Sequence, residues 1–185
     1  LLFPCLFGEG YESMKMLSTK HPEQLLSDTF FSKIPKQELL LLVFVGVVVF
    51  LKSIATGITL GSGGNGGNFA PSLFVGGYTG FAFAYGLNLT SWFDKIPVTN
   101  FTMVGMAGML SGLFHAPLTA MFLIAEITGG YNLMIPLMIV SSISFAISKR
   151  FVPHSMDTQK LAEDGHVMRA DKDLSLIHIS QGIVR

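Results

Sequence analysis

Long apolar runs, separated by short polar or glycine-rich segments, dominate the pattern of hydrophobic and polar positions along this chain. Residues 39–60 form a 22-residue apolar run that only Lys52 interrupts, and at ~1.5 Å per residue a helix of that length crosses a hydrocarbon core. A second helix is predicted from Phe69 to about Tyr85, and a last membrane helix at residues 133–148. The pattern therefore predicts several membrane helices rather than a soluble domain.

Two of the apolar blocks are predicted to be broken. Six glycines fall within eleven positions at residues 57–67, which a membrane helix accommodates only by unwinding. The block at residues 101–125 is interrupted by His115-Ala116-Pro117, so we expect two short helices with Pro117 in the first turn of the second. Short, interrupted helices are typical of transporters and channels, in which half-helix ends meet the substrate near the membrane midplane.

The polar stretches predict which segments lie at the membrane surface. Residues 1–7 look like the end of an earlier helix, so we expect the chain to be a fragment of a longer protein, and residues 8–38 carry mixed charges typical of an interface. Residues 89–100 form an interfacial connection. Lys149 and Arg150 directly follow the last helix and predict a cytoplasmic end by the positive-inside bias.

Composition supports a membrane protein. Of 185 residues 50% are hydrophobic and 16 are phenylalanine, with a mean hydropathy of +0.54. Between Ser53 and Ser148 only Asp94, Lys95 and Glu126 are charged, too few for the solvated surface of a soluble domain. Twelve basic residues balance twelve acidic ones without a basic stripe, so no nucleic-acid partner is expected. One cysteine and scattered histidines predict no metal site and no cofactor.

The start of the second helix is the candidate binding site. Residues 65–73 read Asn-Gly-Gly-Asn-Phe-Ala-Pro-Ser-Leu. The first N–H groups of a helix are unpaired and together carry about half a positive charge, so they attract an anion. Chloride suits uncharged donors that can also release it. We expect the anion to be held by Gly67, Asn68, Phe69 and Ala70. On the pattern alone, a glycine kink that serves packing is the alternative.

The same residues carry a family resemblance. Gly67-Asn68-Phe69-Ala70-Pro71 resembles the GxFxP motif of the CLC family of voltage-gated chloride channels and chloride/proton exchangers, and residues 62–80 and 105–128 resemble its neighbouring segments. The resemblance covers residues 1 to about 161. It implies an all-α, multi-pass membrane protein with tilted and broken helices. Residues 1–153 would be the second, inverted-repeat half of the CLC transport domain, and residues 154–185 the start of the final helix and a cytosolic tail or linker.

The resemblance implies ion transport rather than catalysis. The backbone amides of Asn68 and Phe69 would coordinate chloride, which is the transported substrate. The protein would be an integral membrane homodimer, surrounded by lipid, in a bacterial inner membrane. The family's gating and proton-transfer glutamates belong to its N-terminal half and do not occur here, so channel and proton-coupled exchanger both stay open. A non-conducting structural or regulatory fragment is the alternative from another class.

Two acidic residues need a separate interpretation. Asp157 occupies the place where family members usually have a tyrosine whose hydroxyl points at the chloride. An ionised carboxylate there repels the anion, so Asp157 turns toward the cytosolic mouth, takes up a proton or weakens the site. Glu126 is an intramembrane carboxylate and so a candidate proton relay, whereas the family pattern favours a structural hydrogen bond at a helix end.

Enzyme alternatives have little support from the sequence. Gly61, Gly63 and Gly66 fit G-x-G-x-x-G, but the buried strand and the acidic residue that this fingerprint requires are missing. Ser62 or Ser111 with His115 would make an intramembrane serine protease. Neither serine has the base, the orienting group and the oxyanion donors that this chemistry needs, so no enzyme is expected.

Overall fold

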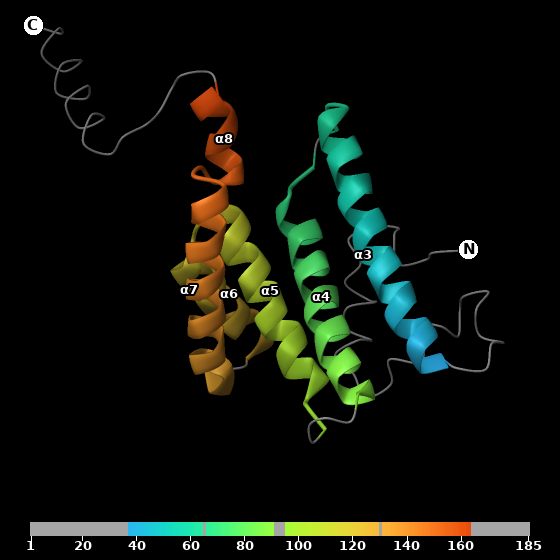
Figure 1. Ribbon diagram of the computed structural model, residues 1–185. Coiled ribbons are helices and arrows are strands. Elements are labelled where there is room, and N and C mark those ends of the chain that lie inside the picture. The colour runs from blue at the N-terminus through green and yellow to red at the C-terminus, as the bar shows by residue number, and fades with distance from the viewer. Residues whose placement is uncertain (1–36, 65, 91–94, 130, 164–185) are drawn as a thin grey trace, which may run out of the picture.

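The computed structural model describes residues 37–64, 66–90, 95–129 and 131–163, and within them every regular element is helical. With the labels of Figure 1, the elements are α3 Gln37–Gly61, α4 Phe69–Leu89, α5 Val98–Phe114, α6 Pro117–Thr128, the 3-10 turn η2 Tyr131–Leu133, α7 Met134–Phe151 and α8 Met156–Glu163. The all-α fold class is confirmed. Predictions for residues 1–36, 91–94 and 164–185 lie outside the described residues.

Helix boundaries follow the predicted breaks. Helix α4 starts at the predicted Phe69, and Pro117 is the first residue of α6. Two helices are longer than predicted. Helix α4 continues to Leu89, and α5 already begins at Val98, within the predicted connection. The extended backbone of Pro97 (φ −68°, ψ 101°) sets the start of α5, whereas α4 meets no proline or turn-forming glycine that would end it earlier.

Glycine ends α3 close to the predicted limit at residue 60. Gly57 and Gly61 remain helical, and the helix unwinds after Gly61. Gly63 has φ +84°, and the N–H of Gly64 donates to the carbonyl of Thr59 at 2.9 Å. This is the turn that a left-handed glycine makes at a helix C-terminus.

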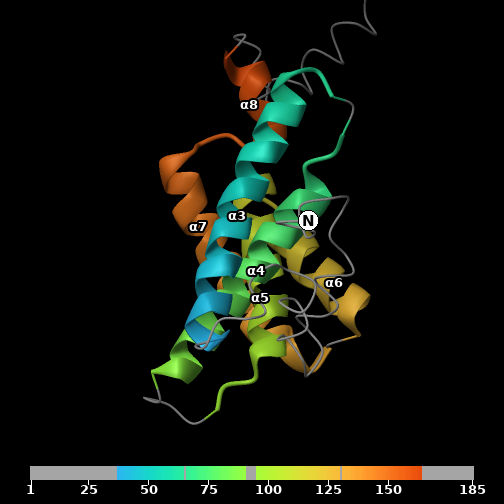
Figure 2. The same ribbon diagram turned by 90° about the vertical axis from the view of Figure 1, so that its right-hand side faces the viewer.

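Helix α4 lies between α3 and α5, and α6 packs against α5 and α7 (Figures 1 and 2). The α4 side chains Phe74, Tyr78 and Phe81 are at most 1% exposed and belong to the hydrophobic core.

By length and composition, two helical segments of the described chain are long and apolar enough to cross a membrane, Leu39–Gly61 and Tyr131–Gln159. The outer face of α3 is an apolar stripe at helical spacing, made of Leu39, Val43, Val47, Phe50, Ile54 and Ile58.

Glycines bring α4 and α5 into backbone contact. A Cβ added at Gly76 would lie 2.7 Å from the carbonyl oxygen of Gly105, and one at Gly105 would lie 2.5 Å from that of Gly76. A Cβ at Gly80 would collide with the carbonyl oxygen of Phe101. Small residues allow this approach, which membrane helices use because lipid provides no hydrophobic drive between them.

Serine hydroxyls tie α7 to α5. Ser144 Oγ donates to the carbonyl of Gly108 at 2.7 Å, and Ser148 Oγ donates to that of Gly112 at 2.5 Å. In the opposite direction, the buried Ser111 Oγ of α5 donates to the Ser141 carbonyl of α7 at 2.6 Å. Helices α5 and α7 are therefore held together by hydrogen bonds, which do not require the hydrophobic effect.

Ser111→Ala is expected to lower the free energy of unfolding by about 1 kcal/mol, because it removes a buried hydrogen bond. Ser53→Ala is the matched control, since the exposed Ser53 hydroxyl bonds only the Val49 carbonyl of its own helix, at 2.9 Å. We expect the control to stay within about 0.5 kcal/mol. Thermal unfolding of the purified full-length protein in detergent measures both variants, and equal shifts would contradict a special role for Ser111.

Candidate anion-binding site

The start of α4 lies beside the middle of α3. Both ribbon views show α4 beginning well short of the C-terminal end of α3, with the connecting segment running back along that helix (Figures 1 and 2). The glycine turn after Gly61 makes this reversal possible, because it redirects the chain immediately at the end of the helix. Because α3 is long enough to span a membrane, a bilayer around α3 would place this helix N-terminus at intermediate depth.

Among the described residues, the backbone donors at this N-terminus have no acceptors. The first intrahelical bond of α4 runs from the N–H of Ser72 to the carbonyl of Asn68, at 3.1 Å. Pro71 has no N–H group, so the free donors of the first turn are those of Phe69 and Ala70, after that of Asn68. Within the described chain these three amides donate to no acceptor. The arrangement can therefore bind an anion.

The side chain of Asn68 adds a second unsatisfied group. Asn68 precedes the helix with φ −77° and ψ −12°, and its side chain forms no capping hydrogen bond. Its Oδ1 atom is buried and has no hydrogen-bond partner among the described residues, which is rare for a buried polar atom. Turning the amide over would put its NH₂ donors in the same position. The group is thus available to a ligand.

The other predicted residues surround this point. Gly67 is exposed and Ala70 is half-buried. The Phe69 ring is 40% exposed, and its centroid lies 6.4 Å from that of Phe114, the last residue of α5. A partly exposed pair of aromatic rings therefore lies beside the free amides. The four predicted residues follow one another at the same helix end.

Asp157 lies in a different element. It is exposed in the first turn of α8, where a negative charge is favoured by the helix dipole. Within the described chain its carboxylate forms no hydrogen bond or ion pair with residues 67–70. The three alternatives for Asp157 that the sequence leaves open therefore stay predictions.

Glu126 forms a local structural contact. It lies near the end of α6 and accepts a hydrogen bond from the hydroxyl of Tyr131 in η2. Both residues are exposed. The bond spans the turn after α6, which supports the structural role of this carboxylate over a proton relay.

The residues proposed for serine chemistry are not assembled. Ser62 Oγ donates to the carbonyl of Thr59 at 3.0 Å, and Ser111 is bonded to α7. His115 lies between α5 and α6, two residues before Pro117, in the left-handed conformation (φ 55°), with Nε2 3.4 Å from Ser148 Oγ. Within the described chain, no three His, Cys, Asp or Glu side chains cluster as metal ligands.

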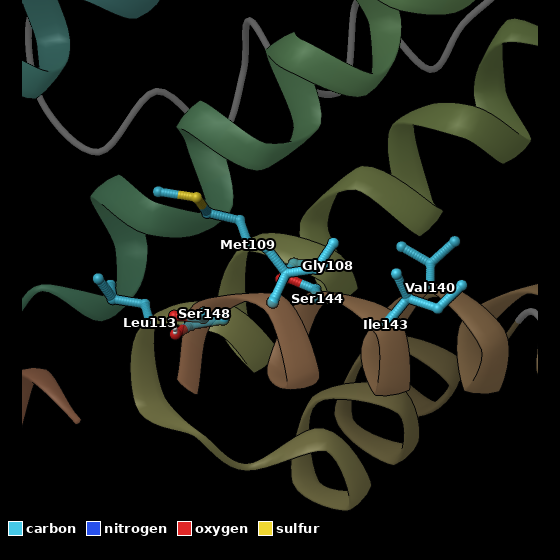
Figure 3. A pocket seen from close by; sticks show the side chains of 9 residues that line it. Gly108, Met109, Leu113, Val140, Ile143, Ser144 and Ser148 are labelled. Carbon is cyan, nitrogen blue, oxygen red and sulfur yellow. Dashed lines mark hydrogen bonds between the residues drawn. The ribbon is translucent and has the colours of Figure 1, made fainter. Parts of the chain in front are cut away.

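A groove of about 520 Å³ runs along α5 and α7 (Figure 3). Met109, Leu113, Val140 and Ile143 make it largely apolar. The Ser144 and Ser148 hydroxyls in its wall are already bonded to backbone carbonyls. The groove therefore offers an anion no donor comparable with the start of α4.

Sequence reasoning missed one buried charge. Lys52 was treated only as an interruption of the first apolar run, yet its side chain is 7% exposed and its Nζ lies 5.2 Å from the centroid of the Phe74 ring. The available signal was its isolation, because it is the single charged residue between positions 39 and 90.

Comparisons with known proteins identify relatives of the chain. A family model described as "Voltage gated chloride channel" matches residues 1–149. The H(+)/Cl(-) exchange transporter ClcA of Vibrio cholerae serotype O1 (strain M66-2) is 37% identical over 105 residues, which are 56% of this chain and 21% of the relative. The voltage-gated ClC-type chloride channel ClcB of Escherichia coli (strain K12 / DH10B) is 31% identical over 165 residues, 88% of this chain and 35% of the relative. The chain thus spans a fifth to a third of these relatives. No solved structure matches significantly.

Proposed function

The chain belongs to the voltage-gated chloride channel (CLC) family, and from this premise we propose that its full-length protein carries chloride across a membrane, with the ion held at the N-terminus of α4. The observation that carries the proposal is the set of free amides at Asn68, Phe69 and Ala70, placed beside the middle of a helix long enough to span a bilayer. A helix start at that depth has to meet protein, water or an ion.

The chemistry of these donors suits transport. Hydrogen bonds to an ion contribute about 1.5–3 kcal/mol each, so two or three amides can replace part of the hydration shell of chloride. They carry no formal charge and therefore do not hold the ion too tightly to release it. Gly67 leaves the approach open, because it places no side chain beside the donors.

The family resemblance supports further features of the proposal. We place the protein in a bacterial inner membrane as a homodimer with lipid around it. The names of the relatives include an exchange transporter and a channel, so proton coupling is decided by experiment. A non-conducting structural or regulatory member of the family is the competing function.

Chloride efflux from liposomes that contain the full-length protein tests the proposal, with external pH recorded in the same cuvette. We expect efflux above that of protein-free vesicles. Chloride efflux coupled to proton uptake by the vesicles, which raises the external pH, would indicate an exchanger. A flat pH trace would indicate a channel. Efflux equal to the protein-free control would contradict transport and favour the non-conducting alternative.

Asp157→Tyr is expected to tighten chloride binding several-fold. The change removes a negative charge from the start of α8 and introduces a hydroxyl donor at the position where the family usually has one. Calorimetric titration of the detergent-solubilised full-length protein with chloride measures the effect, and Asp157→Asn separates loss of charge from gain of the hydroxyl. Unchanged affinity in both variants would remove Asp157 from the site.

A further inference from the structure

Lys52 is a buried charge in the middle of α3. It lies on the inner face of the helix, in line with Leu41, Val45 and Val48, whereas the apolar stripe described above lies on the opposite face. Its exposed fraction is 7%. A charged side chain within a membrane-spanning helix is costly and usually has a functional reason.

The ammonium group faces α4. Lys52 Nζ lies 5.2 Å from the centroid of Phe74, and the Phe74 ring stacks on Tyr78 with centroids 4.1 Å apart. A cation over an aromatic face is attracted to it. Lys52 is thereby held against the same helix whose N-terminus carries the free amides.

Lys52 lies close to the candidate site because α4 begins beside the middle of α3. Lys52 precedes the end of α3 by nine residues, which is ~13.5 Å along the helix. The chain then runs back before α4 begins, as both ribbon views show. Phe74 follows Phe69 by five residues, or ~7.5 Å along α4. The ammonium therefore lies on the order of 10 Å from the first turn of α4.

We infer that Lys52 is an electrostatic residue of the transport pathway, whose fixed positive charge raises the affinity of the α4 site for its anion. The inference rests on the proposed function. Two unit charges ~10 Å apart, at an effective dielectric constant of about 20, attract each other enough to change an affinity about tenfold. At this distance the charge adds to the free amides without becoming a direct, tightly holding ligand.

Neutral and charge-retaining variants of Lys52 test the inference. We expect Lys52→Met and Lys52→Gln to bind chloride about tenfold more weakly than wild type, and Lys52→Arg to stay within about twofold. Met suits the apolar surroundings, so it provides a folded neutral variant if Gln is not tolerated. Chloride affinity is measured by calorimetric titration of the full-length protein, and size-exclusion profiles and thermal unfolding report folding.

Lys95→Met is the matched control. It removes the same charge from an exposed lysine after the far end of α4, where solvent and salt screen the effect. We expect its chloride affinity to stay within about twofold of wild type.

The outcomes separate the two proposals. If wild type binds chloride and the neutral Lys52 variants bind it equally well, the role of Lys52 is overturned while the proposed function stands. If Lys52→Arg loses as much affinity as Lys52→Met, the side chain acts through packing and the electrostatic inference is wrong. If wild type binds no chloride, both proposals fall.

Discussion

Asn68→Pro is expected to weaken chloride binding by at least tenfold, whereas Asn68→Ala changes it only a few-fold. Proline removes the N–H of this position, and one hydrogen bond to an ion contributes about 1.5–3 kcal/mol. The backbone tolerates the change, because the φ of Asn68 is −77°, within the range of the proline ring. Alanine keeps the N–H and removes only the side-chain amide.

Comparing the two variants at one position isolates the backbone donor from the side chain. Chloride titration gives the affinities, and liposome efflux shows whether transport falls with them. Thermal unfolding in the absence of chloride is the control, because both variants should unfold close to wild type. Similar chloride affinities for Asn68→Pro and Asn68→Ala would contradict an anion site at the N-terminus of α4.

Gly80→Ala is expected to have the largest effect on stability, lowering the free energy of unfolding by at least ~2 kcal/mol. The added methyl group would overlap the carbonyl oxygen of Phe101. A backbone atom of the neighbouring helix cannot turn away as a flexible side chain can. Helices α4 and α5 would have to separate, which loosens the core around Phe81.

Gly46→Ala serves as the matched control for Gly80→Ala. It also lies within a helix, but a Cβ there would meet no atom within 4 Å. Alanine is the better helix former, so the control should stabilise the protein by up to about 1 kcal/mol. Thermal unfolding in detergent would show opposite shifts for the two variants, and shifts of the same sign would contradict the close approach of α4 and α5.

Local chemistry explains why several features were predictable from the sequence. Proline at position 117 and the glycines after Gly61 impose breaks that depend on a few neighbouring residues, so the ends of α3, α5 and α6 were placed closely. The free amides at Phe69 follow from where a helix begins. The interpretation of these amides as a chloride site remains a prediction.

Other features depend on contacts between distant segments, which a single sequence does not encode visibly. The left-handed His115 is surrounded by Ser148 and Phe145 of α7, 33 and 30 residues away. The burial of Lys52 depends on Phe74 of the next helix. The continuation of α4 to Leu89 had no local stop signal to mark it. For His115 and Lys52, tertiary packing decided the outcome.

The depth at which α4 begins has an electrical consequence. If α3 spans the membrane, an anion at the proposed site beside the middle of this helix would lie inside the transmembrane field, not at its edge. Moving one elementary charge through the whole field costs about 2.3 kcal/mol per 100 mV. An ion that has crossed about half of it gains or loses roughly 1 kcal/mol, which changes occupancy about sixfold. The bound ion itself would then sense the membrane potential.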